Sequence, residues 1–549
     1  MLLTPPEAAQ SDLYKLDDPE VEMLADIATC QTYQDGEIIF RAGQADVDLF
    51  VVRAGKIDIL NPADDNRLVA WHGPGEFAGD IDLLTRRPVI VTAIARGERT
   101  ELLRVSGAKM RDVLNTIPRI SEKLINAFQL RRKTLQESGV LGMKVAGPKS
   151  CRDTTIIREF LYKNFVPFTW FDTEQEPGQT VWKQMGSPKK KPAIECVDGK
   201  VLQNPPLQKL AECAGIWRDC PKEDVDFAVI GAGPAGIAAA VYAASEGLST
   251  VVLDRLGPGG QVGGSSLVEN FIGFPAGVSG AELATRGVIQ MLKFGARMIA
   301  PVSVDKIQPK PDGSGLSLEL SCGTIFNAQV VLVATGVHWR KLEVPGADRF
   351  ERAGVYYACT SVESFLHQGQ AVAVVGAGNS AGQAAMFLAE RSARIVHLIV
   401  RKNEFGPGMS EYLSERIRAQ PNIELHTGAE IYEIHGDRRI DRADLRHSDG
   451  RTSSIDVNAI FVFIGAEPHA DWLPDSVARD SLGYLLTGPD AVHSGHWPLK
   501  DREPTPLETT LPRLLAGGDV RAGSTKRVGF AVGDGSLAVT CAHRIRAHR

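Results

Sequence analysis

The chain has 549 residues, which is too long for one hydrophobic core and predicts about three to four domains. Hydrophobic residues make up 43% and charged residues 23%, a balance that excludes disordered and fibrous proteins. The formal net charge is −6, so the chain has no overall basic character and we expect no nucleic-acid partner.

The N-terminal sequence MLLTPPE has no basic segment followed by a long apolar one, so we expect no secretory signal. Residues 227–244 contain no charge, but the glycines and the proline among them favour a strand–turn–helix over a membrane span. The eight cysteines include no Cys-x-x-Cys pair, which predicts neither a zinc cluster nor a vicinal redox pair. We therefore expect a cytoplasmic protein without membrane contact, whose thiols are reduced and mostly buried.

Residues 1 to about 106 contain short apolar or alternating runs separated by glycines, and this pattern predicts an all-β segment. Apolar positions at helical spacing follow over residues 106–137. We predict that these elements form a first domain over residues 1–140.

Segment 75–84 (GEFAGDIDLL), with the glycine pattern of the strands before it, resembles the phosphate-binding cassette of a cyclic-nucleotide-binding β-roll. The resemblance implies that Asp80 takes a ribose 2′-hydroxyl. The family's arginine, which pairs with the cyclic phosphate, falls on Val89, and its loss removes a hydrogen bond worth about 1.5–3 kcal/mol. We therefore expect weak or no cyclic-nucleotide binding, unless Arg86 or Arg87 substitutes for the missing arginine.

Residues 146–218 predict a helix, a strand, a hairpin across 197–199 and a closing helix. They resemble a thioredoxin or glutaredoxin-type fold, with Cys151 where an active-site helix begins and Pro192 where that fold carries its cis-proline. Because Thr154 stands where a second cysteine would be, we favour a redox-inert domain. A monothiol with a lowered pKa at the helix N-terminus stays open as the alternative.

From residue 224 onward, β-α-β patterning predicts the α/β class, with a parallel sheet covered by helices. A buried strand over 226–230 runs directly into the sequence GAGPAG, which opens a helix. Glycine is needed there because the chain turns tightly and a pyrophosphate approaches the backbone closely. The next strand ends in an acid, 23 residues after the first glycine, where a carboxylate can bind ribose hydroxyls. The predicted dinucleotide-binding residues are Gly231, Gly233, Pro234, Ala235, Gly236 and Asp254.

A second turn of this kind begins 145 residues later, after the buried run 371–375. The strand that follows it, over 395–400, ends in two cations and no acid. Cations at that position suit a 2′-phosphate, which favours NADPH over NADH. The predicted residues of this second site are Gly376, Gly378, Asn379, Ser380, Arg401 and Lys402.

Two dinucleotide sites in one unit imply hydride transfer between two cofactors, and the usual pair is FAD with a nicotinamide. Near the C-terminus, residues 514–519 indicate a buried strand that ends in Asp519, followed by a helix from about Val528. The acid can bind a ribityl hydroxyl, and the helix N-terminus can stabilise negative charge on a reduced flavin.

These residues resemble the low-molecular-weight thioredoxin reductase family over about 222–549. The resemblance implies an FAD-binding domain split into 222–341 and 462–549, an NADPH-binding domain inserted at 342–461, and a homodimer. It assigns FAD contacts to further positions, which are Gly260, Gln261, Asn270, Thr335, Gly336, Gly518 and Asp519.

One departure from the family is large. Its Cys-Ala-Thr-Cys redox pair falls on Ala358 and Ser361, while Cys359 stands at the place of the intervening alanine. Flavin-to-dithiol transfer needs one thiolate to attack and a second thiol to resolve the disulfide. The sequence therefore predicts flavin and nicotinamide sites without the family's dithiol relay.

We expect an FAD-dependent, NADPH-oxidising enzyme whose electron acceptor is not identified, and we assign no catalytic residue and no metal site. A small disulfide acting through Cys151 or Cys359, a quinone or other small oxidant, and an electron-transfer protein all stay open as acceptors. Two alternatives remain: a flavoprotein that senses redox state with little turnover, and a thioredoxin-disulfide reductase that uses a non-standard cysteine.

Overall fold

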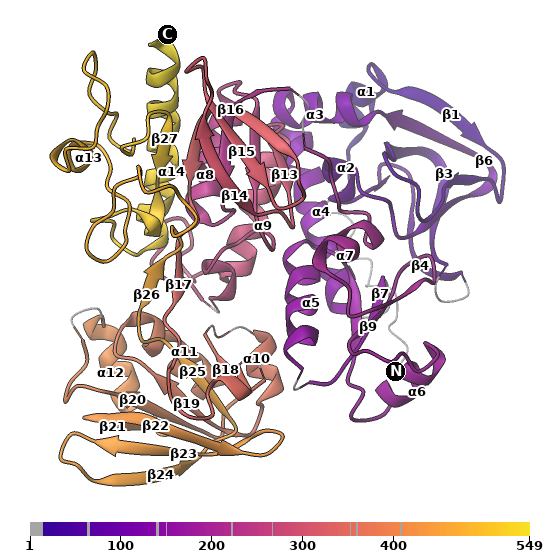
Figure 1. Cartoon of the computed structure of the whole chain (residues 1–549). Coiled ribbons are helices and arrows are strands. Elements are labelled where there is room, and N and C mark those ends of the chain that lie inside the picture. The colour runs from indigo at the N-terminus through magenta and orange to yellow at the C-terminus, as the bar shows by residue number, and fades with distance from the viewer. Residues whose placement is uncertain are drawn as a thin grey trace. The chain divides into compact units, whose positions relative to one another are not determined.

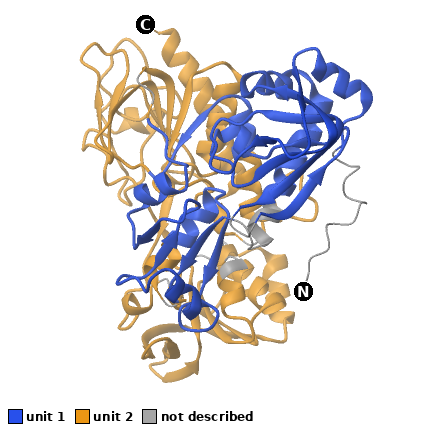
Figure 2. Cartoon of the chain, turned by 90° about the vertical axis from the view of Figure 1, so that its right-hand side faces the viewer, with its two compact units in different colours: residues 1–148, 157–219, 288–301 blue, residues 149–156, 220–287, 302–549 orange. Residues whose placement is uncertain are grey.

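We describe the protein from a computed structural model (Figure 1). The described residues are 15–62, 66–138, 142–149, 151–220, 223–265, 267–351, 353–357, 359, 361–406 and 409–548. Ala358 lies outside this set, and the side chains of 133–138, 361 and 362 are not described. The chain divides into two compact units, coloured in Figure 2. The first holds residues 1–148, 157–219 and 288–301, and the second holds the remainder.

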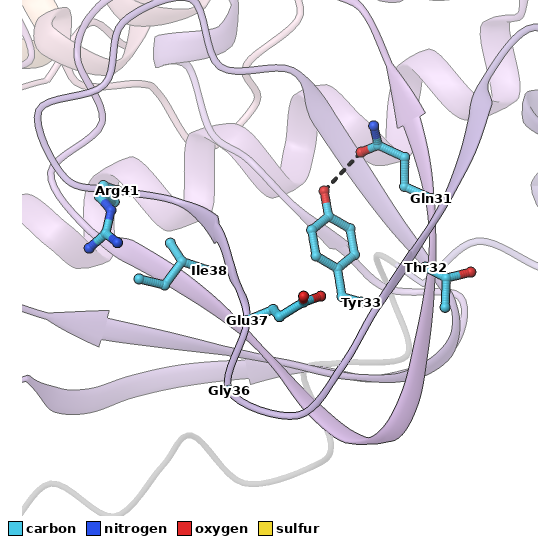
Figure 3. Close-up of a pocket in the computed structure, with 7 residues that line it drawn as sticks. All are labelled: Gln31, Thr32, Tyr33, Gly36, Glu37, Ile38 and Arg41. Carbon is cyan, nitrogen blue, oxygen red and sulfur yellow. Dashed lines mark hydrogen bonds between the residues drawn. The ribbon is translucent and has the colours of Figure 1, made fainter.

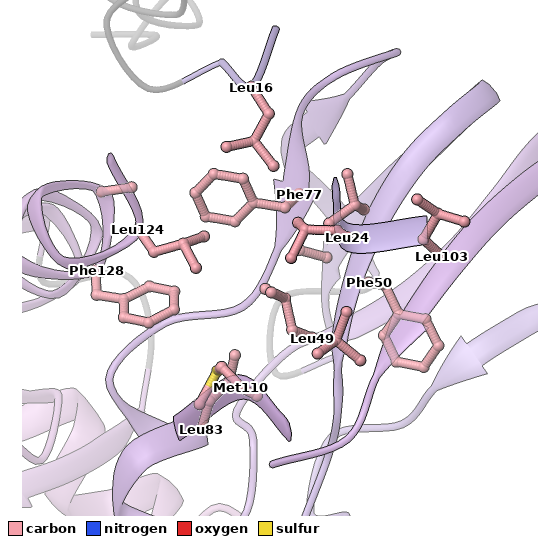
Figure 4. Close-up of a cluster of buried hydrophobic side chains, with 14 of the residues drawn as sticks. Leu16, Leu24, Leu49, Phe50, Phe77, Leu83, Leu103, Met110, Leu124 and Phe128 are labelled. Atoms are coloured by element: carbon pink, nitrogen blue, oxygen red, sulfur yellow. The ribbon is translucent and has the colours of Figure 1, made fainter. Parts of the chain in front are cut away.

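The first part of unit 1 is an antiparallel β-roll with helices at its ends. Its strands hydrogen-bond in the order β1-β6-β3-β4, while β2 pairs with β6 and β5 with β3. Buried side chains fill it, including Phe77 and Phe128, whose rings meet edge to face at 6.2 Å (Figure 4). Its elements are α1 (Asp18–Ala25), β1 (Thr29–Tyr33), β2 (Ile38–Phe40), β3 (Leu49–Asn61), β4 (Arg67–His72), β5 (Phe77–Ala78), α2 (Asp82–Thr85), β6 (Thr92–Val105), α3 (Gly107–Thr116) and α4 (Pro118–Ser138).

The prediction of an all-β segment is wrong at α1 and α2, and the predicted single helix over 106–137 is two helices. Helix α1 forms because Asp17 and Glu20 make a capping box, each accepting the other's backbone N–H at 3.0 and 2.8 Å. The long helix breaks at Ile117 because Pro118 disfavours helical backbone in the residue before it.

The second part of unit 1 contains a four-stranded sheet in the order β10-β9-β7-β8. Strands β7 and β8 are parallel, and the other neighbours are antiparallel. The Lys191–Pro192 peptide bond is cis. This strand order and this cis-proline agree with what the thioredoxin resemblance implies, but the resemblance itself stays a prediction. The elements of this region are β7 (Met143–Ala146), α5 (Arg152–Lys163), β8 (Phe168–Phe171), α6 (Gly178–Gln184), β9 (Ala193–Glu195), β10 (Val201–Gln203) and α7 (Leu207–Cys213), of which residues 152–156 of α5 belong to unit 2.

Cys196 and Cys213 form a disulfide, so the expectation of eight reduced thiols is wrong for this pair. The end of β9 and the end of α7 bring the two Cα atoms to 6.0 Å, within the usual range for a disulfide. Their separation of 17 residues gave no sign of this contact. The expectation of mostly buried thiols is also wrong, because Cys30 is exposed and several others are half-buried.

The first sheet of unit 2 includes the order β12-β11-β16-β15-β14, and β27 joins β16 from near the C-terminus. Strands β11, β12 and β27 run parallel to β16 or to each other, as the β-α-β pattern predicts. Strands β14, β15 and β16 pair antiparallel, so the prediction of a parallel sheet is wrong for this part. The elements of this region are β11 (Val225–Ile230), α8 (Pro234–Ser245), β12 (Thr250–Leu253), α9 (Gly280–Lys293), β14 (Val304–Pro309), β15 (Leu316–Leu320), β16 (Ile325–Val333), β17 (Val337–Trp339), β26 (Ala466–Pro468), α13 (Pro489–His493), β27 (Leu514–Ala516) and α14 (Val528–Ala547). Residues 288–293 of α9 and all of β13 (Arg297–Ile299) belong to unit 1.

A second, five-stranded sheet follows, in the order β18-β25-β19-β20-β21, with all neighbours parallel. A three-stranded antiparallel sheet, β22-β23-β24, packs its apolar side chains against it in a shared core. The elements are β18 (Val355–Tyr356), α10 (Ser361–Leu366), β19 (Ala371–Val375), α11 (Asn379–Arg391), β20 (Ile395–Val400), α12 (Glu411–Ala419), β21 (Ile423–Thr427), β22 (Ala429–Gly436), β23 (Ile440–His447), β24 (Thr452–Asp456) and β25 (Ala459–Val462). Among the described helices, none is long and apolar enough to cross a membrane.

Candidate functional site: two dinucleotide turns and a phosphate-binding cassette

The first dinucleotide turn joins β11 to α8 and leaves no room for side chains. A Cβ on Gly231 would lie 2.4 Å from the carbonyl oxygen of Ala334, and a Cβ on Gly236 would lie 1.9 Å from that of Gly231. Gly231 also has a φ of +106°, which side-chain-bearing residues rarely adopt. Helix α8 begins at Pro234, so its free N–H groups open onto this turn.

Two further glycines line the same turn from elsewhere in the chain. A Cβ on Gly260 would lie 2.8 Å from the Cα of Gly233, and a Cβ on Gly518 would lie 2.9 Å from the Cβ of Ala235. The structure therefore brings predicted residues from three separate segments to one backbone-lined cradle. Such a cradle fits the pyrophosphate of FAD, because N–H groups can approach phosphate oxygens without intervening side chains.

Asp254 follows β12 as predicted, but its carboxylate is already engaged by the backbone. It accepts the N–H groups of Ala232, Leu256 and Gly257 at 2.8, 2.8 and 2.7 Å. These bonds fix the turn against the end of β12 and leave little accepting capacity for a ribose. The predicted role of Asp254 in binding ribose stays a prediction.

The other residues predicted to contact FAD lie in the loops around the turn, and some of their side chains bind those loops. Gln261 donates to the carbonyl of Val337, and Thr335 donates to that of His469 at 2.7 Å, so both side chains support the loops of the site. Asn270 is exposed. Gly336 has a φ of +63° and accepts the His469 N–H at 3.1 Å.

Asp519 is half-buried in the 3-10 turn Gly518–Val520 that follows β27, and its carboxylate has no hydrogen-bond partner among the described residues. Burial raises its pKa, and nearby Lys526 partly opposes that shift. A carboxylate held in this way can accept a ligand hydroxyl. The sequence reasoning missed Asp534, which accepts from the Gly518 N–H at 2.9 Å and from Arg521 at 3.1 Å. The only sequence signal for it was an acid between glycines in the closing helix.

The second dinucleotide turn joins β19 to α11 and repeats the geometry of the first. A Cβ on Gly376 would lie 2.5 Å from the carbonyl oxygen of Phe463, while Gly378 forms the N-cap of α11 with open space around it. Asn379 accepts the backbone N–H of Ser410 at 2.7 Å, so its side chain holds the next loop. Ser380 is exposed in the first turn of the helix.

Arg401 and Lys402 follow β20 and are both exposed. Neither forms an ion pair or a side-chain hydrogen bond with a described residue, although exposed Arg and Glu side chains pair elsewhere in this domain. The backbone carbonyl of Lys402 accepts the Gly428 N–H at 2.9 Å, which fixes the loop that carries the two cations. Two unpaired positive charges beside a dinucleotide turn form a site suited to a phosphate group.

The phosphate-binding cassette of the β-roll has the opposite character, because its charges are already paired. Arg132 of α4 donates to Asp80 at 2.6 Å and lies 2.7 Å from Asp82. The Arg132 side chain is 2% exposed. Burial and the charge of Asp82 raise the pKa of Asp80 to about 6, while Arg132 opposes the shift. Asp80, the residue predicted to bind ribose, is therefore already bound to Arg132 of the same protein.

The end of the cassette is also attached to the second domain of unit 1. Arg87 donates to the carbonyl of Asn164, and Arg132 donates to that of Phe165 at 2.9 Å. Arg218 donates to the carbonyl of Arg86 at 2.8 Å. The Arg87 guanidinium is therefore engaged by a backbone carbonyl of the same protein, and Arg86 is exposed. The suggested substitution of the missing arginine by Arg86 or Arg87 receives no support from this geometry.

The β-roll also carries a shallow pocket (Figure 3). It is lined from β1, β2 and the turn between them, with Tyr33 donating to Gln31 at 2.8 Å. No cassette residue contributes to its lining.

Comparison with known sequences agrees with this geometry. Residues 225–535, more than half of the chain, match the family described as "Pyridine nucleotide-disulphide oxidoreductase". The chain belongs to this family. Residues 30–116 match the family described as "Cyclic nucleotide-binding domain". The predictions of an α/β oxidoreductase that uses FAD and a pyridine nucleotide, with a cyclic-nucleotide-binding-type domain before it, are confirmed at this level.

Individual proteins align with the same region. Thioredoxin reductase of Mycoplasma pneumoniae is 31% identical over 57% of this chain and 93% of its own length. NADH dehydrogenase of Bacillus subtilis is 30% identical over 62% of this chain, and the match spans only 62% of that protein's own length. The crystal structure of Lactococcus lactis thioredoxin reductase matches 59% of this chain and 100% of its own, with 26% identity and a TM-score of 0.53.

Within this family member, Cys359 is placed poorly for thiol chemistry. Its side chain is buried, with 4% of its surface exposed, and burial raises its pKa well above the usual value. The thiolate is the nucleophile in disulfide exchange, and burial disfavours it. Of the two positions that the family's redox pair would occupy, Ala358 lies outside the described residues, and the Ser361 side chain is not described.

Proposed function

We propose that this protein is an NADPH-oxidising flavoenzyme that passes electrons from NADPH through FAD to an acceptor without a Cys-x-x-Cys relay. The observation that carries the proposal is the pair of glycine-lined turns, one beside a half-buried carboxylate and the other beside two unpaired cations. When bound, FAD supplies the group that accepts hydride from a reduced nicotinamide.

The chain's own residues bind and orient the two cofactors. The N-terminus of α8 and the cradle around Gly231 and Gly260 would hold the FAD pyrophosphate, since glycine backbone lines that space. Asp519 would accept a ribityl hydroxyl, and α14 begins nine residues later with its N-terminus available for negative charge.

The preference for NADPH rests on Arg401 and Lys402. Because neither cation is paired within the described structure, both can form charge-assisted bonds to a 2′-phosphate. Because both side chains are exposed and screened by water, each such bond should contribute about 1 kcal/mol. Changing both residues to serine should raise the KM for NADPH by about 10- to 100-fold and leave the KM for NADH nearly unchanged.

The acceptor is proposed to be a small oxidant or an electron-transfer protein and not a dithiol relayed through Cys359. This follows from the burial of that thiol and the absence of any Cys-x-x-Cys in the sequence. Cys151 is half-buried directly before α5 and is the first thiol to test for transfer to a small disulfide. Unchanged turnover in a Cys151→Ser variant would argue against a disulfide acceptor that reacts through Cys151.

Mixing the protein with NADPH in the absence of oxygen tests the enzyme proposal. We expect the flavin absorption to bleach rapidly with NADPH and more slowly with NADH. A protein that contains FAD and is not bleached by NADPH would instead support a sensing flavoprotein. Reduction of thioredoxin at ordinary rates would show that a non-standard cysteine acts as a relay.

We also propose that the protein is a cytoplasmic homodimer, as the resemblance to thioredoxin reductase implies. Light scattering of the purified full chain should give twice the chain mass of 59.4 kDa. A monomer at micromolar concentration would contradict the dimer.

A further inference from the structure

Two neighbouring strands of the five-stranded sheet carry two histidines and a carboxylate on one face. In the parallel register of β20 and β21, His397 lies opposite Glu424, and Ile399 lies opposite His426. Because side chains alternate along a strand, residues two apart share a face. His397, Glu424 and His426 therefore project to the same side of the sheet, at its β21 edge.

The three donor atoms form a compact triangle. Nδ1 of His397 lies 3.1 Å from Nε2 of His426 and 3.2 Å from Oε2 of Glu424, and the third side measures 4.0 Å. The point equidistant from these atoms lies about 2.0 Å from each, which matches zinc–nitrogen and zinc–carboxylate distances. Tetrahedral zinc needs donor atoms about 3.3 Å apart, so the exposed Glu424 carboxylate must turn toward His426 to complete the site, while the strands stay in place.

The environment suits a divalent transition metal. His397 is 7% exposed, and its Nδ1 faces Nε2 of His426 at 3.1 Å, so an ion bound by both rings would be shielded from water on that side. Glu424 is 56% exposed, which leaves a path for the ion and an open position for water. Two imidazoles and one carboxylate favour zinc over calcium or magnesium, which prefer sites made only of oxygen.

A second histidine and carboxylate cluster in the same domain lacks this geometry. His435 directs Nε2 to Asp444 at 2.7 Å and the other ring nitrogen toward Glu433 at 3.9 Å. One ion cannot bind both nitrogens of a ring. Asp444 also accepts from Ser454 at 2.6 Å and lies 3.3 Å from Arg442, so its oxygens are satisfied. This cluster supplies a matched control.

We propose that His397, Glu424 and His426 bind one zinc-type divalent ion on the nucleotide-binding domain. The ion would join the edge strand β21 to β20. The chain after β21 reaches Gly428, which hydrogen-bonds to the backbone of Lys402, so the ion would also stabilise the loop with the two cations. This site is separate from both dinucleotide turns and does not depend on the proposed enzyme activity.

The test uses the full-length protein, freed of metal with a chelator and titrated with Zn²⁺ against a chromophoric competitor. We expect one ion per chain at this site. His426→Asn and Glu424→Gln should each weaken zinc binding by at least about tenfold, while His435→Asn should leave it unchanged. Because Glu424 is exposed, its variant should fold, and equal FAD content will show that each variant is intact.

Co²⁺ gives a second readout, since it absorbs visible light strongly when four-coordinate and weakly when bound only by water. Zn²⁺ should also raise the Tm of the wild type, because a ligand that binds only the folded state stabilises it, and should not do so in His426→Asn. No zinc binding by the wild type, or equal binding by the wild type, His426→Asn and Glu424→Gln, would overturn the proposal.

Discussion

The first dinucleotide turn and the β-roll cassette both match family motifs in sequence, yet they differ in what the fold does with them. At the turn, recognition depends on bare backbone, and its segments pack so closely that a Cβ on these glycines would lie 1.9–2.9 Å from a neighbouring protein atom. In the cassette, recognition depends on a free carboxylate. Arg132 donates a hydrogen bond to Asp80 at 2.6 Å, so that carboxylate is not free. The turn is prepared for a ligand, whereas the cassette is paired with its own protein.

The difference follows from where the determining residues lie in the sequence. Gly231 and Gly236 meet through local chain geometry, so a short motif predicts their contact. Arg132 comes from a helix 52 residues after Asp80, and nothing in the cassette sequence indicates it. A motif made of backbone is therefore safer evidence of binding than a motif made of one charged side chain.

Replacing Arg132 with methionine should have the largest effect, because it leaves Asp80 and Asp82 buried without their direct ion-pair partner. Breaking a buried ion pair on one side costs about 3–5 kcal/mol. Urea unfolding followed by hydrogen exchange of the β3 amides will measure the loss in the β-roll. Arg53→Met, which removes an exposed pair with Glu22, should cost about 1 kcal/mol or less. Equal losses for the two variants would contradict the account of the cassette.

The Gly236→Ala substitution should have the second-largest effect. The added Cβ would meet the Gly231 oxygen at 1.9 Å, so the backbone must shift, at a cost of about 1–3 kcal/mol. We expect FAD affinity to fall by about 10- to 100-fold, measured as flavin absorbance per chain after dialysis. Gly533→Ala is the control, because its Cβ would meet nothing within 4 Å. Full FAD occupancy in Gly236→Ala would show that the turn does not hold the cofactor.

The raised pKa of Asp80 predicts a pH effect of intermediate size. The pKa is about 6 in the folded state and 3.8 in an unperturbed chain, so the folded state binds more protons between these values. The free energy of unfolding of the β-roll should therefore fall as pH rises from about 4 to about 6, by on the order of 2 kcal/mol. Asp80→Asn should remove this fall. A wild type and Asp80→Asn with the same pH dependence would show that Asp80 is not the group responsible.

The smallest expected effect is cyclic AMP binding. With Asp80 paired and Val89 in place of the family's arginine, calorimetry should detect no binding tighter than about 1 mM. Val89→Arg alone should not restore binding, because Asp80 stays engaged. A micromolar Kd for the wild type would show that the cassette opens and that its comparison with the turn is mistaken.

Local sequence patterns predicted much of the fold. The hydrophobic pattern predicted the bounds of three strands, β12, β19 and β20, and the start of α14. These elements are buried runs next to a glycine or a charged residue. The failures depend on contacts between distant residues. Cys196 and Cys213 meet only when α7 folds back beside β9, and Asp534 approaches Gly518 only across the start of α14. The side-chain roles of Gln261 and Asn379 also required coordinates, because an amide can serve a ligand or a neighbouring loop equally well.

The most direct test of the central claim counts electrons. Each NADPH delivers two electrons, FAD accepts two, and a redox-active disulfide would accept two more. Anaerobic titration of the FAD-loaded protein should reach full flavin bleaching at about one NADPH per FAD, and Cys196→Ser/Cys213→Ser should give the same value. An endpoint near two NADPH per FAD in both proteins would reveal a second dithiol couple and contradict an enzyme without a cysteine relay.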